Sequence, residues 1–142
     1  MYRSKFESQF AAVVGKSVKY ETDKIKYEIP ASKHTYTPDF TLAPNVYIET
    51  KGRFVASDRK KHLLIKKQHP EITILFVFMN ARNTITKTSK TTYADWAKQN
   101  DFQYIDWSCT SNEAIKSLPL KFSLPTKPKS YPLSKAIVRV IM

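Results

Sequence analysis

The sequence predicts an α/β domain in which a mixed β-sheet is flanked by helices. Three stretches lead to this fold: an amphipathic segment at 4–14, a tight hairpin at 38–51, and a basic helical segment followed by a continuous apolar run at 72–79. A hairpin is antiparallel, whereas two strands joined through a helix favour a parallel pair, so both kinds of pairing are expected. The 142 residues, 42% of them apolar, suffice for one domain with its own core.

The first helix is expected to begin after Ser4, a good N-cap, and to end near Val14, with Gly15 as its stop. Its buried stripe contains Phe6, Phe10, Val13 and Val14 at helical spacing. Glu7 lies at the edge of this stripe and not on the open face. Its simplest interpretation is an ordinary solvated acid.

Residues 17–29 alternate as one or two strands, and 30–38 read as an extended connector bounded by prolines. The hairpin then turns at 43–45, which places Leu42 opposite Val46 and Asp39 opposite Glu49. Side chains alternate between the faces of a strand. One face is therefore apolar and belongs in a core, and the other carries Asp39, Thr41, Tyr47, Glu49 and Lys51.

A second helix is expected from Ser57 to His69, capped by Ser57 or Asp58, and 72–79 form a central strand buried on both faces. Thr92 caps a third helix at 93–99, a short strand follows at 102–105, and 111–118 form a last helical turn or two. Residues 1–118 thus make the folded domain. Residues 119–142, with four of the eight prolines and no acid, are interpreted as a basic tail, of which 136–142 could add an edge strand or meet a partner.

The charge of the chain indicates its partner. With 24 Lys and Arg against 12 Asp and Glu, the net charge is +12, which points to a polyanion and most often to nucleic acid; the alternative is a generally basic protein. One cysteine, Cys109, excludes an intrachain disulfide and fits a reducing compartment. No segment approaches the ~20 apolar residues of a membrane span, so a cytoplasmic protein without a membrane partner is expected.

Two carboxylates and a lysine converge on the polar face of the hairpin. Like charges directly opposite each other destabilise a sheet, and a divalent cation between them would reverse the sign of the interaction. Pro38-Asp39, nine residues, and Glu49-Thr50-Lys51 form the pattern PD-(D/E)xK of many metal-dependent nucleases with a restriction-endonuclease-like core. The alternative is a surface salt bridge between Asp39 and Lys51, which is common and contributes little.

The spacing suits phosphodiester hydrolysis, which needs an activated water and stabilisation of negative charge. Mg²⁺ prefers oxygen ligands and is held by few carboxylates. Asp39 could bridge two Mg²⁺ ions, Glu49 and the Thr50 carbonyl could hold the ion that carries the water, and Lys51 could orient that water or meet the phosphate. Mn²⁺ is a possible substitute.

Three separated blocks resemble the phage endonuclease I family of Holliday-junction resolvases. They are 27–40 (YEIPASKHTYTPDF), 48–52 (IETKG) and 58–71, which contains DRKKHLLI and QHPE. The resemblance extends from about Arg3 to the third helix and fades after about Asn100. It implies that Asp39, Glu49 and Lys51 are catalytic, and that Glu7 joins them.

The resemblance also implies an intertwined homodimer. Residues 1–28 would be swapped into the partner and 29–33 would form a bridge, so each site would combine Glu7 of one chain with the other residues of its partner. A metal-dependent endonuclease that cleaves branched DNA and leaves a 5′-phosphate is expected.

Several basic residues are candidates for contacts to the DNA backbone, with solvated surface charge as the alternative. They are Arg3, Arg59, Lys60, Lys61, Lys66, Lys67 and Arg82. The spacings of His34, His62 and His69 match no standard zinc motif, and structural or phosphate-contact roles are preferred for them. Tyr36 could lie beside DNA or pack in the core.

Two rival functions stay open from the sequence. One is the same chemistry on another target, a sequence-specific nicking or restriction-like endonuclease on duplex DNA. The other is a DNA-binding module without catalysis, which the presence of all four residues Glu7, Asp39, Glu49 and Lys51 disfavours.

Overall fold

The computed structural model describes residues 2–29 and 32–119. In chain order its elements are α1 (Lys5–Val14), β1 (Lys19–Tyr20), β2 (Ile25–Ile29), β3 (Ser32–Tyr36), β4 (Phe40–Ala43), β5 (Val46–Lys51), α2 (Ala56–Gln68), β6 (Thr73–Phe78), α3 (Tyr93–Gln99), β7 (Gln103–Asp106), the 3₁₀ turn η1 (Trp107–Cys109) and α4 (Asn112–Lys116).

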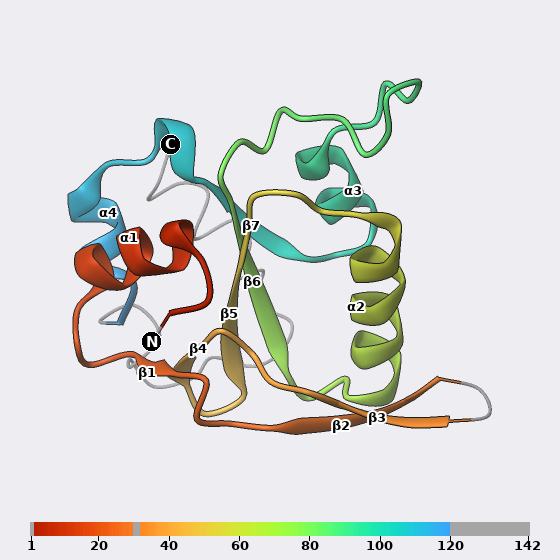
Figure 1. Ribbon diagram of the computed structural model, residues 1–142, viewed down its shortest axis with the longest axis horizontal. Coiled ribbons are helices and arrows are strands. Elements are labelled where there is room, and N and C mark those ends of the chain that lie inside the picture. The colour runs from red at the N-terminus through yellow and green to blue at the C-terminus, as the bar shows by residue number, and fades with distance from the viewer. Residues whose placement is uncertain (1, 30–31, 120–142) are drawn as a thin grey trace.

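The main sheet is mixed, as the sequence predicts. Its five strands lie in the order β1-β4-β5-β6-β7, and β2 and β3 form a separate two-stranded sheet. β4 is antiparallel to β1 and β5, whereas β6 is parallel to β5 and β7. Figure 1 shows α1 and α4 on one side of the sheet and α2 and α3 on the other. The molecule therefore has three layers, with the sheet in the middle.

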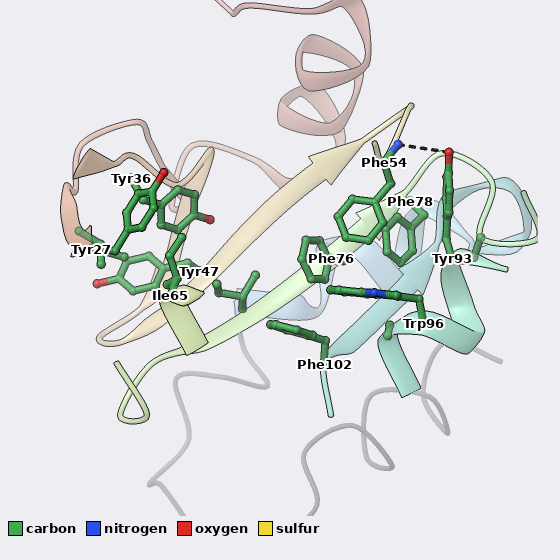
Figure 2. Packing of buried hydrophobic residues seen from close by; sticks show 14 residues of the cluster. Tyr27, Tyr36, Tyr47, Phe54, Ile65, Phe76, Phe78, Tyr93, Trp96 and Phe102 are labelled. Atoms are coloured by element: carbon green, nitrogen blue, oxygen red, sulfur yellow. Dashed lines mark hydrogen bonds between the residues drawn. The ribbon is translucent and has the colours of Figure 1, made fainter. Parts of the chain in front are cut away.

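Each face of the sheet has its own apolar core. On the α1 side, Phe10, Phe40 and Ile48 pack with residues of α4. On the α2 and α3 side, aromatic rings from Phe54, Phe76 and their neighbours form the larger cluster shown in Figure 2. Alternate residues of β6 enter the two cores, Leu75 and Val77 on one face and Phe76 and Phe78 on the other, so the prediction of a central strand buried on both faces is confirmed.

The first and third helices begin and end as predicted. The Ser4 hydroxyl accepts the Glu7 N–H, and Gly15 ends α1 at a φ of 94°, which favours glycine. Thr92 and Asp95 form a reciprocal capping box at α3. For α2 the predicted cap is wrong, because the helix begins one residue earlier and Val55 occupies the N-cap without a side-chain hydrogen bond.

The hairpin turn differs from the prediction. The loop has two residues, Pro44 and Asn45, and Ala43 pairs with Val46 where Leu42 was expected. A bulge between Thr41 and Ala43 absorbs the difference, and Asn45 takes the left-handed φ of 62° that the turn requires. Beyond the bulge the register is as expected, with Thr41 opposite Tyr47 and Phe40 opposite Ile48.

The expected connector at 30–38 is in part a strand. β3 pairs antiparallel with β2, from Ile25 with Tyr36 to Ile29 with Ser32. The Gln68 side chain holds this hairpin to the end of α2 through the backbone of Glu28, donating to its carbonyl at 2.5 Å and accepting from its N–H at 2.6 Å. The short final helix is also present, as α4 capped by Ser111.

Two expectations fall outside the described residues: the tail from 120 onward with its edge strand at 136–142, and residues 30–31 of the expected bridge. Within the described part of the chain, no helix has the length and apolar character needed to cross a membrane.

Replacing Phe54 by alanine should strongly destabilise the fold. Phe54 is 1% exposed and its ring meets those of Phe76, Phe78, Tyr93 and Trp96. Its truncation is expected to cost about 3–5 kcal/mol in the free energy of unfolding, measured by urea denaturation. Leu63→Ala, at a site 39% exposed, is the control and should change it by less than about 0.5 kcal/mol. Equal effects of the two variants would contradict this assignment of the core.

Candidate active site

Asp39, Glu49 and Lys51 lie on neighbouring strands. Asp39 immediately precedes β4, and Glu49 and Lys51 belong to the last half of β5. Because Phe40 pairs with Ile48, the next residues outward, Asp39 and Glu49, lie side by side. The register that the sequence predicts for the two acids is therefore the one observed, although the turn that sets it is different.

The backbone and side chain of Asp39 are both held by hydrogen bonds. Its Oδ2 accepts the Thr50 N–H and the Thr50 hydroxyl, each at 2.9 Å. Its carbonyl accepts the Glu21 N–H at 2.9 Å. These bonds connect the start of β4 to β5 on one side and to the end of β1 on the other. One carboxylate oxygen of Asp39, Oδ1, is not used in either bond to Thr50.

Glu49 is buried, at 5% exposure, between a phenol and an ammonium group. The Tyr36 hydroxyl donates to Oε2 at 2.6 Å, and Lys51 Nζ lies 3.6 Å from Oε1. Lys51 Nζ also lies 3.4 Å from Asp58 Oδ1 in the first turn of α2. The lysine thus bridges β5 and α2 while it stays next to Glu49.

The carboxylates of Glu7 and Glu21 lie close to that of Asp39 and form a cluster with it. Ligand oxygens of Glu7, Glu21 and Asp39 all lie within 4.8 Å of one another. Glu7 is 5% exposed and comes from the core-facing side of α1 in the same chain. Its placement beside Asp39 agrees with the role that the resemblance implies and overturns the simplest interpretation of a solvated helix acid.

Sequence reasoning missed Glu21. It follows β1 directly, and the pairing of Tyr20 with Phe40 brings it next to Asp39. Its backbone is in the left-handed region, with a φ of 48°, and Arg3 Nε lies 3.0 Å from its carboxylate. The pairing of β1 with β4 is the signal that would reveal it, and that pairing is not local in the sequence.

The site holds more negative charge than its protein surroundings favour. Burial first, and then the neighbouring Asp39 and Glu21, raise the pKa of Glu7 to about 7. Burial and Asp39 also raise the pKa of Glu49 to about 7, although Lys51, the Tyr36 hydroxyl and Lys61 oppose the shift. A cation would stabilise the ionised forms of both groups. Since all the donors are oxygens, the site fits a hard cation such as Mg²⁺.

The residues expected to hold the cation lie in two adjoining parts. Glu7, Glu21 and Asp39 form one cluster of carboxylates, whereas Glu49 lies outside this cluster, in contact with Tyr36 and Lys51. Asp39 belongs to the cluster and is also the neighbour of Glu49. The Thr50 carbonyl, between Glu49 and Lys51 in β5, belongs to the same strand end.

Besides Arg3, which is paired with Glu21, three of the basic residues expected to contact DNA are engaged within the chain. The Arg59 guanidinium donates to the carbonyls of Phe54 at 2.6 Å and Ile85 at 3.4 Å. Lys61 Nζ lies 5.4 Å from the centre of the Tyr36 ring. Lys66 Nζ donates to the Asp101 carbonyl at 2.8 Å, in the last turn of α2, whereas Asp58, which contacts Lys51, lies in the first turn.

Lys60, Lys67 and Arg82 are exposed, and Arg3 is exposed except for its ion pair with Glu21. Of the histidines, His62 is fully buried, and among the residues that the structure describes neither of its ring nitrogens has a hydrogen-bond partner. Burial therefore holds the pKa of His62 well below its usual value. His34 stacks on Tyr27, and His69 contacts Glu71 and the Lys26 carbonyl. These positions agree with structural roles.

Buried carboxylates beside a lysine, at the end of paired strands in a basic α/β domain, are typical of enzymes that hydrolyse phosphate esters with bound cations. The family model described as Phage endonuclease I matches residues 1–124. The chain therefore belongs to the phage endonuclease I family.

Two relatives show how far the similarity extends. Endonuclease I of Escherichia phage T7 is 46% identical over 92 residues, which cover 65% of this chain and 62% of that protein. Endodeoxyribonuclease 1 of Enterobacteria phage T3 is 47% identical over 87 residues, which cover 61% of this chain and 57% of that protein. The chain thus spans about three fifths of the length of the curated relatives that it matches.

The variant Glu49→Gln should gain stability relative to wild type as the pH rises, when both are kept in EDTA. The folded-state pKa of Glu49 is about 7, above its ordinary value of 4.5, so the protonated form favours folding. That contribution is complete below about pH 4.5 and is lost as the pH rises through 7. The difference in Tm between variant and wild type should therefore become more positive from pH 5.5 to 8.5, by several degrees.

Glu113→Gln, at an exposed position of α4, controls for the loss of one negative charge. A Tm difference for Glu49→Gln that did not change with pH would contradict the raised pKa.

Proposed function

We propose that this protein is a Mg²⁺-dependent endonuclease that cleaves branched DNA, such as four-way junctions, by phosphodiester hydrolysis. The observation that carries the proposal is the juxtaposition of Asp39, just before β4, with Glu49 and Lys51 on β5 and with Glu7, in a member of the phage endonuclease I family. The core around this site is interpreted as the PD-(D/E)xK nuclease core. Its site of action would be the cytoplasm of a phage-infected cell.

DNA cleavage is supported by the relatives, whose names are endonuclease I and endodeoxyribonuclease 1. The preference for branched DNA rests on the motifs at 27–40, 48–52 and 58–71, which resemble those of junction resolvases. The net charge of +12 favours a polyanionic substrate of either kind.

The side chains of the site divide the work. Glu7, Asp39, Glu49 and the Thr50 carbonyl would supply the oxygen ligands of two Mg²⁺ ions, and Asp39 would contribute to both. Bound Mg²⁺ would lower the pKa of a coordinated water and neutralise charge on the phosphate, and Mn²⁺ would substitute for it. Lys51 Nζ lies between Glu49 and Asp58, and its proposed role is to orient the water or to meet the phosphate charge.

The exposed basic residues give a route for the DNA backbone. Lys60 lies in the second turn of α2, the helix whose first turn contacts Lys51 through Asp58. Arg82 lies in the loop after β6, whose carboxyl end adjoins that of β5. Contacts from Arg3, Lys61 and Lys67 are also proposed. Arg59 and Lys66 would first have to release the carbonyls that they bind.

A swapped homodimer remains part of the proposal. In a swap, contacts made within the closed chain are made instead between chains, so the proximity of Glu7 and Asp39 is compatible with both arrangements. The β2–β3 hairpin is the element that would open, with 29–33 as the bridge between the two halves.

Asp39→Asn should abolish cleavage of a four-way junction in Mg²⁺ and leave junction binding in Ca²⁺ intact. The amide removes the charge of the oxygen donor that both cations would share, while Thr50 can still donate to the side-chain carbonyl. Cleavage is measured on gels against the linear arms of the same junction, and Asp101→Asn, an exposed acid, is the control. Undiminished cleavage by Asp39→Asn would reject the active site.

Wild type also decides between the rivals. Equal rates on junction and arms would favour a nicking or restriction-like enzyme on duplex DNA, and binding without cleavage in Mg²⁺ would favour a non-catalytic module.

Mixed dimers test the swap. If Glu7→Gln and Asp39→Asn chains are unfolded together and refolded, a swapped heterodimer has one site with both changes and one intact site. Nicking of the junction should then return to about a quarter of the wild-type rate, because half of the dimers are mixed and one of the two sites in each mixed dimer is intact. Each variant refolded alone is the control, and a mixture as inactive as both would contradict the swap.

A further inference from the structure

Tyr36 meets Glu49 inside the protein, away from solvent. The Tyr36 hydroxyl donates to Glu49 Oε2 at 2.6 Å, and the two residues are 3% and 5% exposed. The bond joins β3 to β5 and holds the Tyr36 side chain in the protein interior. This decides between the two interpretations of Tyr36, which packs beneath the site and does not lie beside DNA.

Neighbouring side chains hold the Tyr36 ring in place. The His62 ring meets it edge-on, with the centroids 5.2 Å apart and an interplanar angle of 88°. His62 is itself wedged against Phe76, at 4.9 Å between centroids, and is fully buried. Lys61 Nζ lies over the ring. In Figure 2, Tyr36 lies with Tyr27, Tyr47 and Ile65 at one end of the aromatic cluster. The packed ring therefore fixes the orientation of the hydroxyl toward Glu49.

The two carboxylate oxygens of Glu49 have different partners. Oε2 is occupied by Tyr36, whereas Oε1 lies 3.6 Å from Lys51 Nζ. A hydrogen bond donated to a carboxylate favours its ionised form, which is the form that binds a cation. Burial and the charge of Glu49 raise the pKa of the phenol well above its usual value, so Tyr36 stays a donor.

We propose that Tyr36 is a positioning residue of the active site: its buried hydroxyl orients Glu49 so that Oε1 is presented to the metal ion and to Lys51. The inference deepens the proposed nuclease function, on which it rests for the identity of the cation site. Outer hydrogen bonds of this kind typically change metal affinity by 10–100-fold. The chain offers a matched comparison for this bond.

That comparison is Tyr93. Its hydroxyl accepts the Phe54 N–H at 3.2 Å, in the same aromatic cluster, at the end away from Tyr36 (Figure 2). Tyr36→Phe and Tyr93→Phe each remove one buried hydroxyl and one hydrogen bond and keep the ring. A general loosening of the core would affect both variants alike, whereas loss of orientation at Glu49 would affect only the first.

The test measures Mn²⁺ binding to the full-length protein without DNA, with free Mn²⁺ quantified by electron paramagnetic resonance. Tyr36→Phe should weaken Mn²⁺ at one site by about tenfold or more, and Tyr93→Phe should leave both sites unchanged. In the Glu49→Gln background, Tyr36→Phe should cause no further loss, because the carboxylate that it orients is gone. Cleavage by Tyr36→Phe should fall at limiting Mn²⁺ and recover in large part at saturating Mn²⁺.

Unchanged Mn²⁺ affinity of Tyr36→Phe, or equal losses in the two tyrosine variants, would overturn the positioning role. If the wild-type protein bound Mn²⁺ but cleaved no DNA, the proposed nuclease function would be rejected. The Mn²⁺ affinities of the tyrosine variants would still decide whether Tyr36 positions Glu49. If wild type bound no Mn²⁺, both would fail.

Discussion

The structure depends on one electrostatic constraint, the burial of several carboxylates within a few ångströms of one another. Glu7 and Glu49 are each 5% exposed, and Asp39 lies beside both. Burial and the neighbouring charge of Asp39 raise the pKa of Glu7 and of Glu49, so ionisation of these two groups weakens the folded state. The donors around them, Thr50, Tyr36 and Lys51, offset part of this cost. The cation that we propose for this site would offset the remainder.

The sheet supplies the rigidity that this constraint needs. β6 lies between β5 and β7 and is buried on both faces, with Phe76 and Phe78 in one core and Leu75 and Val77 in the other. A strand that packs on both faces resists a shift in register, because a shift of one residue would exchange the two sets of side chains. The position of Glu49 and Lys51 on the adjacent β5 is thereby fixed.

Local signals predicted most of the elements, and non-local pairing accounts for the differences. Ser4 and Thr92 cap helices because their hydroxyls act within one turn. Val55 at the N-cap of α2 could not be foreseen, because its apolar side chain makes no capping bond and Ser57 and Asp58 carry the stronger local signal. The bulge in β4 and the pairing of β2 with β3 depend on partners along the strands, not on the residues alone.

The sequence by itself determined the family, the mixed α/β fold and the catalytic candidates Asp39, Glu49 and Lys51, because alternation on a hairpin and the motif spacing are local properties. Only the tertiary structure brought Glu21 to Asp39, turned Tyr36 inward to Glu49 and drew Arg59 onto backbone carbonyls. The pairs Glu21–Asp39, Tyr36–Glu49 and Arg59–Ile85 are 13 to 26 positions apart in the sequence. They join segments whose docking is set by the packing of the two cores, and no short-range pattern encodes them.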